Sequence, residues 1–182
     1  MFELRSINVD DFDEFYEHLS IHFPADERKI KEKELEELSN LMFKPNYIYL
    51  DNVLVGYICC WEFSTFCFIE HFAILEEHRN KGIGTDFLKY FIGKSKKYVV
   101  LEVERPKLDL LPDESDLAYR RIKFYERIGF NVNNFDYQQP SYGLGLNPLP
   151  MYLCSYPKPL IESEYDVITC VIYHYVYNVK RV

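Results

Sequence analysis

Long apolar runs are absent from this sequence, which excludes a helix that crosses a membrane. No stretch approaches the roughly 18–20 consecutive apolar residues that such a helix needs. The N-terminal stretch, Met1 to Arg5, also lacks the basic start and the apolar block of a secretory signal peptide. Internal repeats and low-complexity tracts are missing as well. We therefore expect a cytoplasmic protein with no membrane partner.

Basic residues are scarce relative to acidic ones. The chain has 21 Lys and Arg against 29 Asp and Glu, which gives a formal net charge of −8 and a pI near 5.2. Proteins that bind nucleic acid need a basic face, so no nucleic-acid partner is expected. The acidity is compatible with a cationic amine as substrate, and equally with a charge that only keeps the protein soluble.

Cysteine pairs of the kind that bind metal or shuttle electrons are missing too. The number of cysteines is odd, and none form a C-x-x-C pair. Four of them lie in apolar, strand-like surroundings, so we expect buried free thiols in a reducing compartment and no metal site. The five are Cys59, Cys60, Cys67, Cys154 and Cys170.

The apolar sequence that is present suffices for a single folded domain. Of the 182 residues, 48% are hydrophobic and 27% charged, so we expect one globular domain over residues 1–182. Apolar alternation and turn residues predict strands over residues 2–7, 47–50, 53–62, 66–75, 98–103, 130–137 and 151–156. Caps and helical spacing predict helices starting at Asp10 or Asp11, at 24–26 (to about Leu41), at Ile83, and at Asp113, Ser115 or Asp116.

Two segments near the C-terminus need separate arguments. Residues 138–150 are rich in proline and glycine and predict a loop. Residues 162–177 suit a helix or, given their β-branched and aromatic content, a strand. The helix is favoured because Val171, Ile172 and Tyr175 can share one face.

The most informative stretch is the loop Arg79-Asn80-Lys81-Gly82-Ile83-Gly84. It lies between the apolar run 66–75 and the helical pattern that begins at Ile83. Glycines let several backbone N–H groups converge, and a helix N-terminus adds about half a positive charge beside them. This arrangement predicts a site for a phosphate or pyrophosphate group.

Two common phosphate-binding loops do not match this stretch. A P-loop requires Lys-Ser/Thr after its last glycine, whereas Gly84 is followed by Thr85 and Asp86. A dinucleotide-binding loop requires Gly-x-Gly-x-x-Gly, and its third glycine is replaced by Phe87. The spacing Arg-x-x-Gly-x-Gly instead resembles the pyrophosphate loop of the GNAT superfamily, the acyl-CoA-dependent N-acyltransferases.

Three further segments strengthen this resemblance. Residues 70–74 and 98–103 look like the fourth and fifth strands of the family, and residues 122–130 match its helix in which a tyrosine lies four residues before a glycine. In order and spacing the resemblance covers roughly residues 47–131. One position departs from the pattern: Ala118 stands where many members carry an Asn seven residues before the tyrosine, which would remove a contact to the cofactor or to water.

The resemblance implies a fold of the α+β class with three layers. Its central sheet would be mixed and mostly antiparallel, with 6–7 strands, one parallel pair that splays apart, and helices on both faces. It also implies acetyl-CoA as cosubstrate, with no metal.

The same resemblance assigns residues to the cosubstrate. The backbone of Phe72, Ala73 and Ile74 would bind the pantetheine arm like an added strand. The pyrophosphate would be held by the N–H groups of Asn80, Lys81, Gly82, Ile83, Gly84 and Thr85. The Arg79 side chain would also reach phosphate. Lys81 or Lys97 would approach the ribose phosphate, or each would be a plain surface charge.

Aminolysis of a thioester needs a neutral amine, a donor to the oxyanion, and a proton for the leaving thiolate. Tyr125 resembles the family tyrosine beside the thioester sulfur, and a phenol with a pKa near 10 can donate to a developing thiolate. The alternative is that Tyr125 only packs on the sheet. By family analogy the N–H of Ile74 is the oxyanion donor.

Glu70 is the best candidate for the base that takes the amine proton. It is a lone carboxylate on an apolar strand, where burying a charge is costly, and strand alternation places Glu70 and Phe72 on one face and His71 on the other. We expect partial burial to raise the pKa of Glu70. The alternative is that Glu70 pairs with a basic side chain, or contacts substrate without taking a proton. His71 and Glu102 are further candidates.

Together these features predict an N-acetyltransferase that transfers an acetyl group from acetyl-CoA to a primary amine of a small molecule or peptide, by direct attack in a ternary complex. A catalytically silent acyl-CoA-binding module and a structural dimerisation protein are the alternatives. No residue pattern identifies the acceptor. Four tyrosines flank the 138–150 loop and line either the amine pocket or a homodimer contact: Tyr137, Tyr142, Tyr152 and Tyr156.

Overall fold

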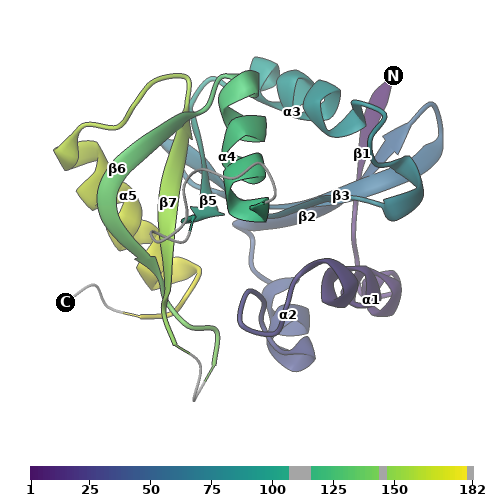
Figure 1. Cartoon of the computed structure of the whole chain (residues 1–182). Helices are drawn as coiled ribbons and strands as arrows, with labels where there is room; N and C mark the ends of the chain where they lie inside the picture. The colour runs from purple at the N-terminus through teal and green to yellow at the C-terminus, as the bar shows by residue number, and fades with distance from the viewer. Residues whose placement is uncertain (107–115, 144–146, 180–182) are drawn as a thin grey trace.

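A seven-stranded mixed sheet with helices on both faces forms the centre of the protein (Figure 1). The structure is a computed structural model that describes residues 1–106, 116–143 and 147–179. The strand order is β1-β2-β3-β4-β5-β7-β6, and among these pairs only β4 and β5 run parallel. This arrangement confirms the predicted fold class.

The strands are β1 (Phe2–Ser6), β2 (Phe43–Leu50), β3 (Val53–Glu62), β4 (Phe66–Ile74), β5 (Tyr98–Glu104), β6 (Asn131–Gln139) and β7 (Leu149–Tyr156). The helices are α1 (Phe12–His22), α2 (Lys31–Glu37), α3 (Ile83–Lys94), α4 (Leu117–Ile128) and α5 (Glu162–Tyr175), with a short 3-10 turn η1 (Glu76–His78) after β4. The favoured helical reading of residues 162–177 is therefore confirmed.

Each face of the sheet has its own hydrophobic core. Phe15 of α1, Trp61 of β3 and Ile172 of α5 belong to one buried cluster, and Phe87 of α3 and Ile122 of α4 belong to the other. Figure 1 shows the consequence: α3 and α4 lie over one face, whereas α1, α2 and α5 lie on the other. We call these the α3/α4 face and the α1/α2 face.

The parallel pair β4–β5 separates partway along its length. The last paired residues are Ile69 and Leu101, although β4 continues to Ile74 and β5 to Glu104. The next residue on each strand beyond this pair is a glutamate, Glu70 or Glu102. The two strands therefore separate at the position of these two glutamates.

A β-bulge in β4 changes which way its side chains point. Cys59 of β3 pairs with His71, and the next residue, Cys60, pairs with Ile69, so Glu70 is the extra residue. A bulge of this kind interrupts the alternation of faces. As a result, Glu70 and His71 both point to the α1/α2 face, where they meet Trp61 and the ring of Phe23. The prediction that His71 lies opposite Glu70 is wrong for this reason.

Phe72 confirms the shift, because its ring stacks on Phe87 of α3, with centroids 5.7 Å apart, on the α3/α4 face. Glu70 and Phe72 were predicted to share a face, and this part of the prediction is also wrong.

The predicted second helix is much shorter than expected. Of residues 24–41 only Lys31–Glu37 form α2, and Ile30 before it is extended, with φ −66° and ψ 157°. The side chain of Lys29 turns inward instead of lying on a solvated helix face, and only 7% of the residue is exposed. Strand β2 is longer than expected, since it begins at Phe43 and includes Pro45.

The predicted caps differ in outcome. Asp11 stands at the N-cap position of α1, but its side chain makes no capping hydrogen bond within the described residues. Asp116 caps α4 by accepting from the N–H of Ala118 at 2.8 Å; the other two candidate caps, Asp113 and Ser115, lie outside the described residues. Strands β6 and β7 extend into the predicted 138–150 loop, of which residues 144–146 are likewise outside.

All five cysteines are free thiols, as predicted. Four are buried, whereas Cys170 is exposed. Within the described parts of the chain, no helix is long and apolar enough to cross a bilayer.

Candidate active site

A cavity of about 1240 Å³ opens between the separated ends of β4 and β5. It extends from α4 on one face to the end of α1 on the other. Among its lining residues are predicted site residues from β4, from the loop after it and from α4: Glu70, Phe72, Ala73, Ile74, Arg79, Asn80 and Tyr125. The structure therefore brings these together. The other predicted loop residues, Lys81, Gly82, Ile83, Gly84 and Thr85, follow Asn80 into the first turn of α3 without lining the cavity.

The loop after β4 has the backbone geometry of an anion-binding turn. Asn80 and Gly82 both have positive φ, 60° and 80°, and Gly82 is the N-cap of α3. The first N–H groups of a helix have no acceptor within the helix, and alternating backbone handedness points successive N–H groups inward. The loop can thus offer several donors to a phosphate group.

Gly84 allows α3 to approach β4 closely. A Cβ at this position would lie 3.3 Å from Cγ1 of Ile74 and 3.6 Å from the ring of Phe124. Any side chain here would therefore press on Ile74 of β4 and on Phe124 of α4. The glycine keeps the start of α3 beside the end of β4.

Charged side chains of both signs line the cavity. Four basic side chains come from α4: Arg120, Arg121, Lys123 and Arg127. Four glutamates come from β4, β5 and the segment before α2: Glu27, Glu70, Glu102 and Glu104. Glu104 pairs with Arg121 at 3.7 Å, so the two sets meet there. The basic side on α4 suits phosphate groups, and the other three glutamates suit a cationic amine. Sequence analysis did not single out the basic side chains, which look like an ordinary solvated helix face.

The predicted cationic residues of the loop have local partners. Arg79 donates through Nε to the carbonyl of Ile74 at 3.0 Å, which ties the loop to the end of β4. Lys81 donates to the carbonyl of Glu77 at 2.7 Å. Lys97 pairs with Glu62 at 2.6 Å, before the start of β5 and at the opposite end of the strand from the cavity. Its predicted approach to a ribose phosphate is therefore wrong.

Tyr125 lies in the last turns of α4 and lines the cavity. Its ring meets Phe124 and Phe130 edge to face, with centroids 5.1 Å and 5.7 Å away. Gly129, with φ 109°, ends the helix directly after this turn. Burial raises the pKa of Tyr125, so the phenol is fully protonated at neutral pH. It can therefore donate a proton or a hydrogen bond into the cavity.

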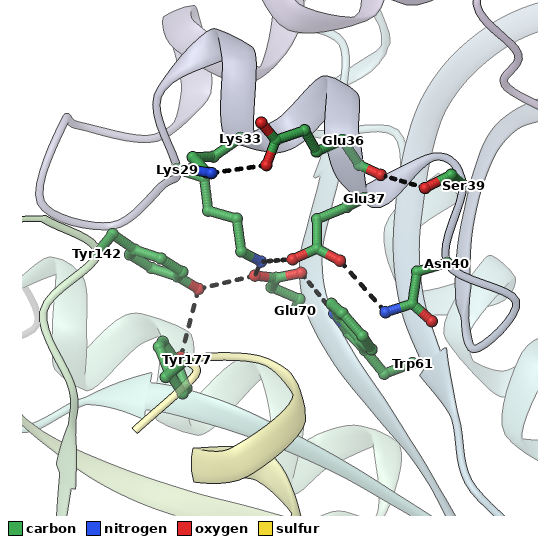
Figure 2. Close-up of polar contacts among 10 residues, drawn as sticks. All are labelled: Lys29, Lys33, Glu36, Glu37, Ser39, Asn40, Trp61, Glu70, Tyr142 and Tyr177. Carbon is green, nitrogen blue, oxygen red and sulfur yellow. Dashed lines mark hydrogen bonds and ion pairs between the residues drawn. The ribbon is translucent and has the colours of Figure 1, made fainter. Parts of the chain in front are cut away.

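Glu70 forms a buried ion pair, shown in Figure 2. Its side chain is 0% exposed, and Lys29 Nζ lies 2.7 Å from Oε1. Trp61 Nε1 donates to Oε2 at 2.7 Å, and the Tyr142 hydroxyl donates to Oε1 at 3.0 Å. Burial alone would raise the pKa of Glu70, but the charge of Lys29 and these hydrogen bonds hold it below its ordinary value.

The expectation of a raised pKa at Glu70 is therefore wrong. The alternative considered for this residue, pairing with a basic side chain, is what the structure shows. A carboxylate that already accepts bonds from Lys29, Trp61 and Tyr142 has a low affinity for a further proton.

Other carboxylates surround the same lysine. Glu37 lies 3.9 Å from Lys29 Nζ. Glu34 is 0% exposed, and neither of its oxygens has a hydrogen-bond partner among the described residues. Burial raises the pKa of Glu34 to about 8, so this carboxyl is mostly neutral at pH 7. Lys29 is therefore balanced mainly by Glu70. Burial lowers the pKa of Lys29, but the charge of Glu70 and its hydrogen bond to Lys29 help raise it above its ordinary value.

Glu102 has the properties expected of a proton acceptor. Its carboxyl accepts hydrogen bonds from two hydroxyls, Tyr137 on Oε1 and Tyr177 on Oε2, the second at 2.6 Å. Burial raises the pKa of Glu102 to about 7, against the effect of both tyrosines, and the nearby negative charge of Glu70 adds to the rise. His71 is fully buried away from the cavity lining, and burial lowers its pKa.

The four tyrosines around the 138–150 loop have different places. Tyr142 lines the cavity, whereas Tyr137 is 0% exposed and belongs to the core, so Tyr137 cannot form a homodimer contact. Tyr152 lies under Arg105, and Tyr156 lies beside Gly129.

Two residues of the site, Lys29 and Tyr177, were not predicted from the sequence. The isolated charge of Glu70 signalled that a partner must exist, but not which one.

Comparison with known proteins agrees with this geometry. The family model described as the acetyltransferase (GNAT) family matches residues 4–130. A protein of Bacillus subtilis (strain 168), named "Putative acetyltransferase YjbC", is 28% identical over 158 residues, which cover 85% of this chain and 75% of that protein.

Solved structures give the same result. The structure named "Putative acetyltransferase from GNAT family" of Bacteroides thetaiotaomicron is 34% identical, with a TM-score of 0.87 over 98% of this chain and 99% of that one. Arabidopsis thaliana Naa50, in complex with the bisubstrate analogue CoA-Ac-MVNAL, shares the fold at 18% identity, with a TM-score of 0.58 over 86% of this chain and 99% of that one. The protein is therefore a member of the GNAT acetyltransferase family, and it is an acyltransferase.

Proposed function

We propose that the protein is an N-acetyltransferase that uses acetyl-CoA to acetylate a primary amine of a small molecule or peptide, by direct attack in a ternary complex. The observation that carries this proposal is the start of α3, with its positive-φ loop, beside a cavity between two separated strands. Naa50, which shares the fold, is solved with an analogue that joins CoA to a peptide. That complex supports both the cosubstrate and an amine acceptor.

The residues present fit acetyl-CoA. The N–H groups of residues 80–85 and the Arg79 side chain would hold the pyrophosphate, and the basic side of the cavity would face the other phosphate. Beyond Ile69, β4 has no partner strand on the β5 side within the described residues, and the carbonyl of Ile74 there accepts from Arg79 Nε. The backbone of Phe72, Ala73 and Ile74 would bind the pantetheine arm along this edge as an added strand.

Two side chains of this protein would transfer protons, and one backbone N–H would stabilise the negative charge of the oxyanion. Glu102 takes a proton from the acceptor ammonium, which leaves a neutral amine whose nitrogen attacks the thioester carbonyl. The N–H of Ile74 stabilises the oxyanion. As the carbon–sulfur bond breaks, Tyr125 donates its proton to the leaving thiolate and regains one after the new amide nitrogen loses its second proton. We assign the base role to Glu102 rather than Glu70 because only Glu102 has a raised pKa.

The test has two stages, binding and turnover. Acetyl-CoA at about 100 times its dissociation constant should stabilise the folded protein by roughly 2.7 kcal/mol, measured as a thermal shift. Gly84→Glu should abolish the shift, because a side chain there meets Ile74 and a negative charge repels phosphate. Gly93→Glu is the matched control: it adds the same charge to α3 at a position where a Cβ contacts none of the described neighbouring residues within 4 Å, so the shift should remain.

Turnover is then measured as acetyl-CoA consumption with a panel of small and peptidyl amines. Consumption that depends on one class of amine supports the proposal. Binding without turnover of any amine would instead indicate a silent acyl-CoA-binding module. An equal thermal shift in Gly84→Glu and wild type would place the cosubstrate elsewhere.

A further inference from the structure

A chain of hydrogen bonds crosses the acceptor side of the cavity. Lys29 Nζ lies 2.7 Å from Glu70 Oε1, and the Tyr142 hydroxyl lies 3.0 Å from the same oxygen. The hydroxyls of Tyr142 and Tyr177 are 3.3 Å apart, and Tyr177 donates to Glu102 Oε2 at 2.6 Å. Figure 2 shows the chain from Lys29 to Tyr177. It joins the two carboxylates that stand where β4 and β5 separate.

The number of hydrogens in this chain is one too few. Tyr142 and Tyr177 each have a single hydroxyl hydrogen, but three contacts require one: Tyr142 with Glu70, Tyr142 with Tyr177, and Tyr177 with Glu102. While Glu102 is ionised, one contact therefore lacks a hydrogen. If both hydroxyls donate to carboxylates, no hydrogen lies between the two phenol oxygens of Tyr142 and Tyr177.

A proton on Glu102 completes the chain. The protonated carboxyl donates to Tyr177, Tyr177 donates to Tyr142, and Tyr142 donates to Glu70, which Lys29 keeps ionised. Each contact then has one hydrogen, and all donors point toward the Glu70 carboxylate. Hydrogen bonds oriented in one direction strengthen one another. The arrangement thus favours the state in which Glu102 carries a proton.

We propose that Tyr142 and Tyr177 couple the buried Lys29–Glu70 ion pair to Glu102, so that Glu102 gains a proton when the acceptor ammonium loses one. Glu70, Tyr142 and Tyr177 are positioning residues in this scheme, and Glu102 is the catalytic residue. The proposal deepens the proposed function and rests on it for the identity of the proton donor. The coupling itself is a property of the protein alone and is measurable without substrate.

Titratable groups from several elements face Glu102. Tyr137 of β6 and Tyr177 after α5 donate to its oxygens, Glu70 of β4 lies across the strand separation, Glu27 belongs to the segment before α2, and Tyr142 comes from the loop after β6. As direct donors Tyr137 and Tyr177 favour the anion of Glu102, whereas the two glutamates favour its protonated form. Tyr177 therefore acts on Glu102 in two ways, as a donor to the anion and as a link of the chain, whereas Tyr142 acts as a link.

The decisive measurement is an NMR titration of the side-chain carboxyl of Glu102 in the protein without ligand, with ¹³C-labelled glutamate and assignment by Glu102→Gln. The wild-type pKa should be near 7. Glu70→Gln removes the charged end of the chain and should lower it. Tyr142→Phe breaks the chain while Tyr177 still donates to the anion, so it should lower the value too.

Tyr177→Phe breaks the same chain but also removes a donor to the carboxylate. The pKa of Glu102 should therefore lie higher in Tyr177→Phe than in Tyr142→Phe. Tyr98→Phe is the matched control, because the Tyr98 hydroxyl bonds a carboxylate, Glu164, at the other end of β5 at 2.9 Å. This variant should leave Glu102 unchanged. No shift in Tyr142→Phe, or equal shifts in Tyr142→Phe and Tyr177→Phe, would overturn the proposal.

Turnover separates this inference from the proposed function. The acid limb of the kcat/KM profile should move with the NMR value in each variant. The expected NMR shifts without acetylation of any amine would leave the coupling intact and refute the proposed function. Acetylation with an unshifted Glu102 in every variant would refute the coupling alone. Should Glu70→Gln fail to fold, Tyr142→Phe and Tyr177→Phe, which both keep the ion pair and the ring, give the same decision.

Discussion

Two glutamates next to each other across the strand separation have pKa values shifted in opposite directions. Burial acts on both, but Glu70 meets a lysine ammonium, whereas Glu102 meets only neutral hydroxyls and a neighbouring negative charge. A nearby cation outweighs burial, and a pair of phenols does not. The environment therefore divides two chemically identical side chains into a fixed anion, Glu70, and a titrating group, Glu102.

Tyr125→Phe tests the role of the phenol at the residue scale. The change keeps the ring, which packs between Phe124 and Phe130, and removes only the hydroxyl. If the hydroxyl protonates the thiolate, turnover should fall about 10²–10⁴-fold under conditions where chemistry is rate-limiting, with acetyl-CoA affinity nearly unchanged. Tyr90→Phe, which loses a hydroxyl bonded to the carbonyl of Phe2, is the control. Wild-type turnover in Tyr125→Phe would leave this residue a packing role only.

Glu34→Gln tests whether a buried carboxyl is neutral. The pKa of Glu34 is raised from 4.5 to about 8, so the folded protein keeps this proton while the unfolded chain loses it. Stability from this group is complete below pH 4.5 and is lost as the pH rises to about 8. Glu34→Gln removes that loss, so its advantage over wild type in urea unfolding should grow from about pH 5 to pH 8, by at most about 1.4 kcal/mol per unit.

Glu32→Gln, an exposed change on the same helix, controls for the removal of a charge. The same pH slope in Glu34→Gln, Glu32→Gln and wild type would show that Glu34 is ionised in the folded protein.

At the scale of elements, the bulge in β4 decides what the cavity contains. One extra residue, Glu70, turns two successive side chains to the α1/α2 face and leaves Phe72 for the α3/α4 face. Without the bulge, Glu70 and Phe72 would share the α1/α2 face, and His71 would point to the α3/α4 face. The edge of β4 beyond the bulge stays free of β5, which leaves it available to bind an extended ligand.

Gly56→Ala tests how closely β3 must approach β4 from the side opposite β5. A Cβ on Gly56 would lie 2.3 Å from the carbonyl oxygen of Ala73, and a backbone atom cannot move away without distorting the strand. The variant should lose about 1–3 kcal/mol of unfolding free energy. If Ala73 holds the pantetheine arm as proposed, the variant should also bind acetyl-CoA more weakly.

Gly93→Ala is expected to change the unfolding free energy in the opposite direction in the same experiment. Its Cβ meets nothing within 4 Å in α3, so the variant should gain about 0.5–1 kcal/mol and keep its affinity. Equal stability of the two variants in denaturant unfolding would show that β3 and β4 are not closely apposed at Gly56.

On the scale of the whole molecule, the hydrogen-bonded chain from Lys29 to Glu102 joins five separate segments. Lys29 comes from the segment before α2, Glu70 from β4, Glu102 from β5, Tyr142 from the loop after β6, and Tyr177 from the chain after α5. Their polar groups form hydrogen bonds with one another in the core on the α1/α2 face of the sheet. The ion pair is thus the point at which the N-terminal helices and the C-terminal segment meet the sheet.

Lys29→Met should destabilise the protein by about 3–5 kcal/mol at neutral pH, because it leaves the buried Glu70 carboxylate without its cation. The loss should shrink at low pH, where Glu70 becomes protonated. The double variant Lys29→Met/Glu70→Gln removes both charges and should regain most of the loss in urea unfolding. An additive double variant would show that the two side chains do not interact in solution.

By itself the sequence determined the local features of this protein. Periodicity and turn residues predicted most strands and the helices at both sides of the site, and the glycine loop before Ile83 predicted an anion site where the structure has the N-terminus of α3. Tyr125 before Gly129 was recognisable in the same way. Each of these depends on residues within a few positions of one another, because caps, turns and helix ends are local interactions.

Only the tertiary structure decided the chemistry of the carboxylates. The partner of Glu70 lies 41 residues away, and Tyr177 lies 75 residues from Glu102. The bulge at Glu70 is equally invisible to strand alternation, which assumes a regular pairing with β3. The pKa of a buried group depends on burial and on every charge and donor that the fold brings near it. The sequence could therefore nominate Glu70, Glu102 and Tyr125, but the packing of distant segments made one glutamate an anchor and the other a candidate base.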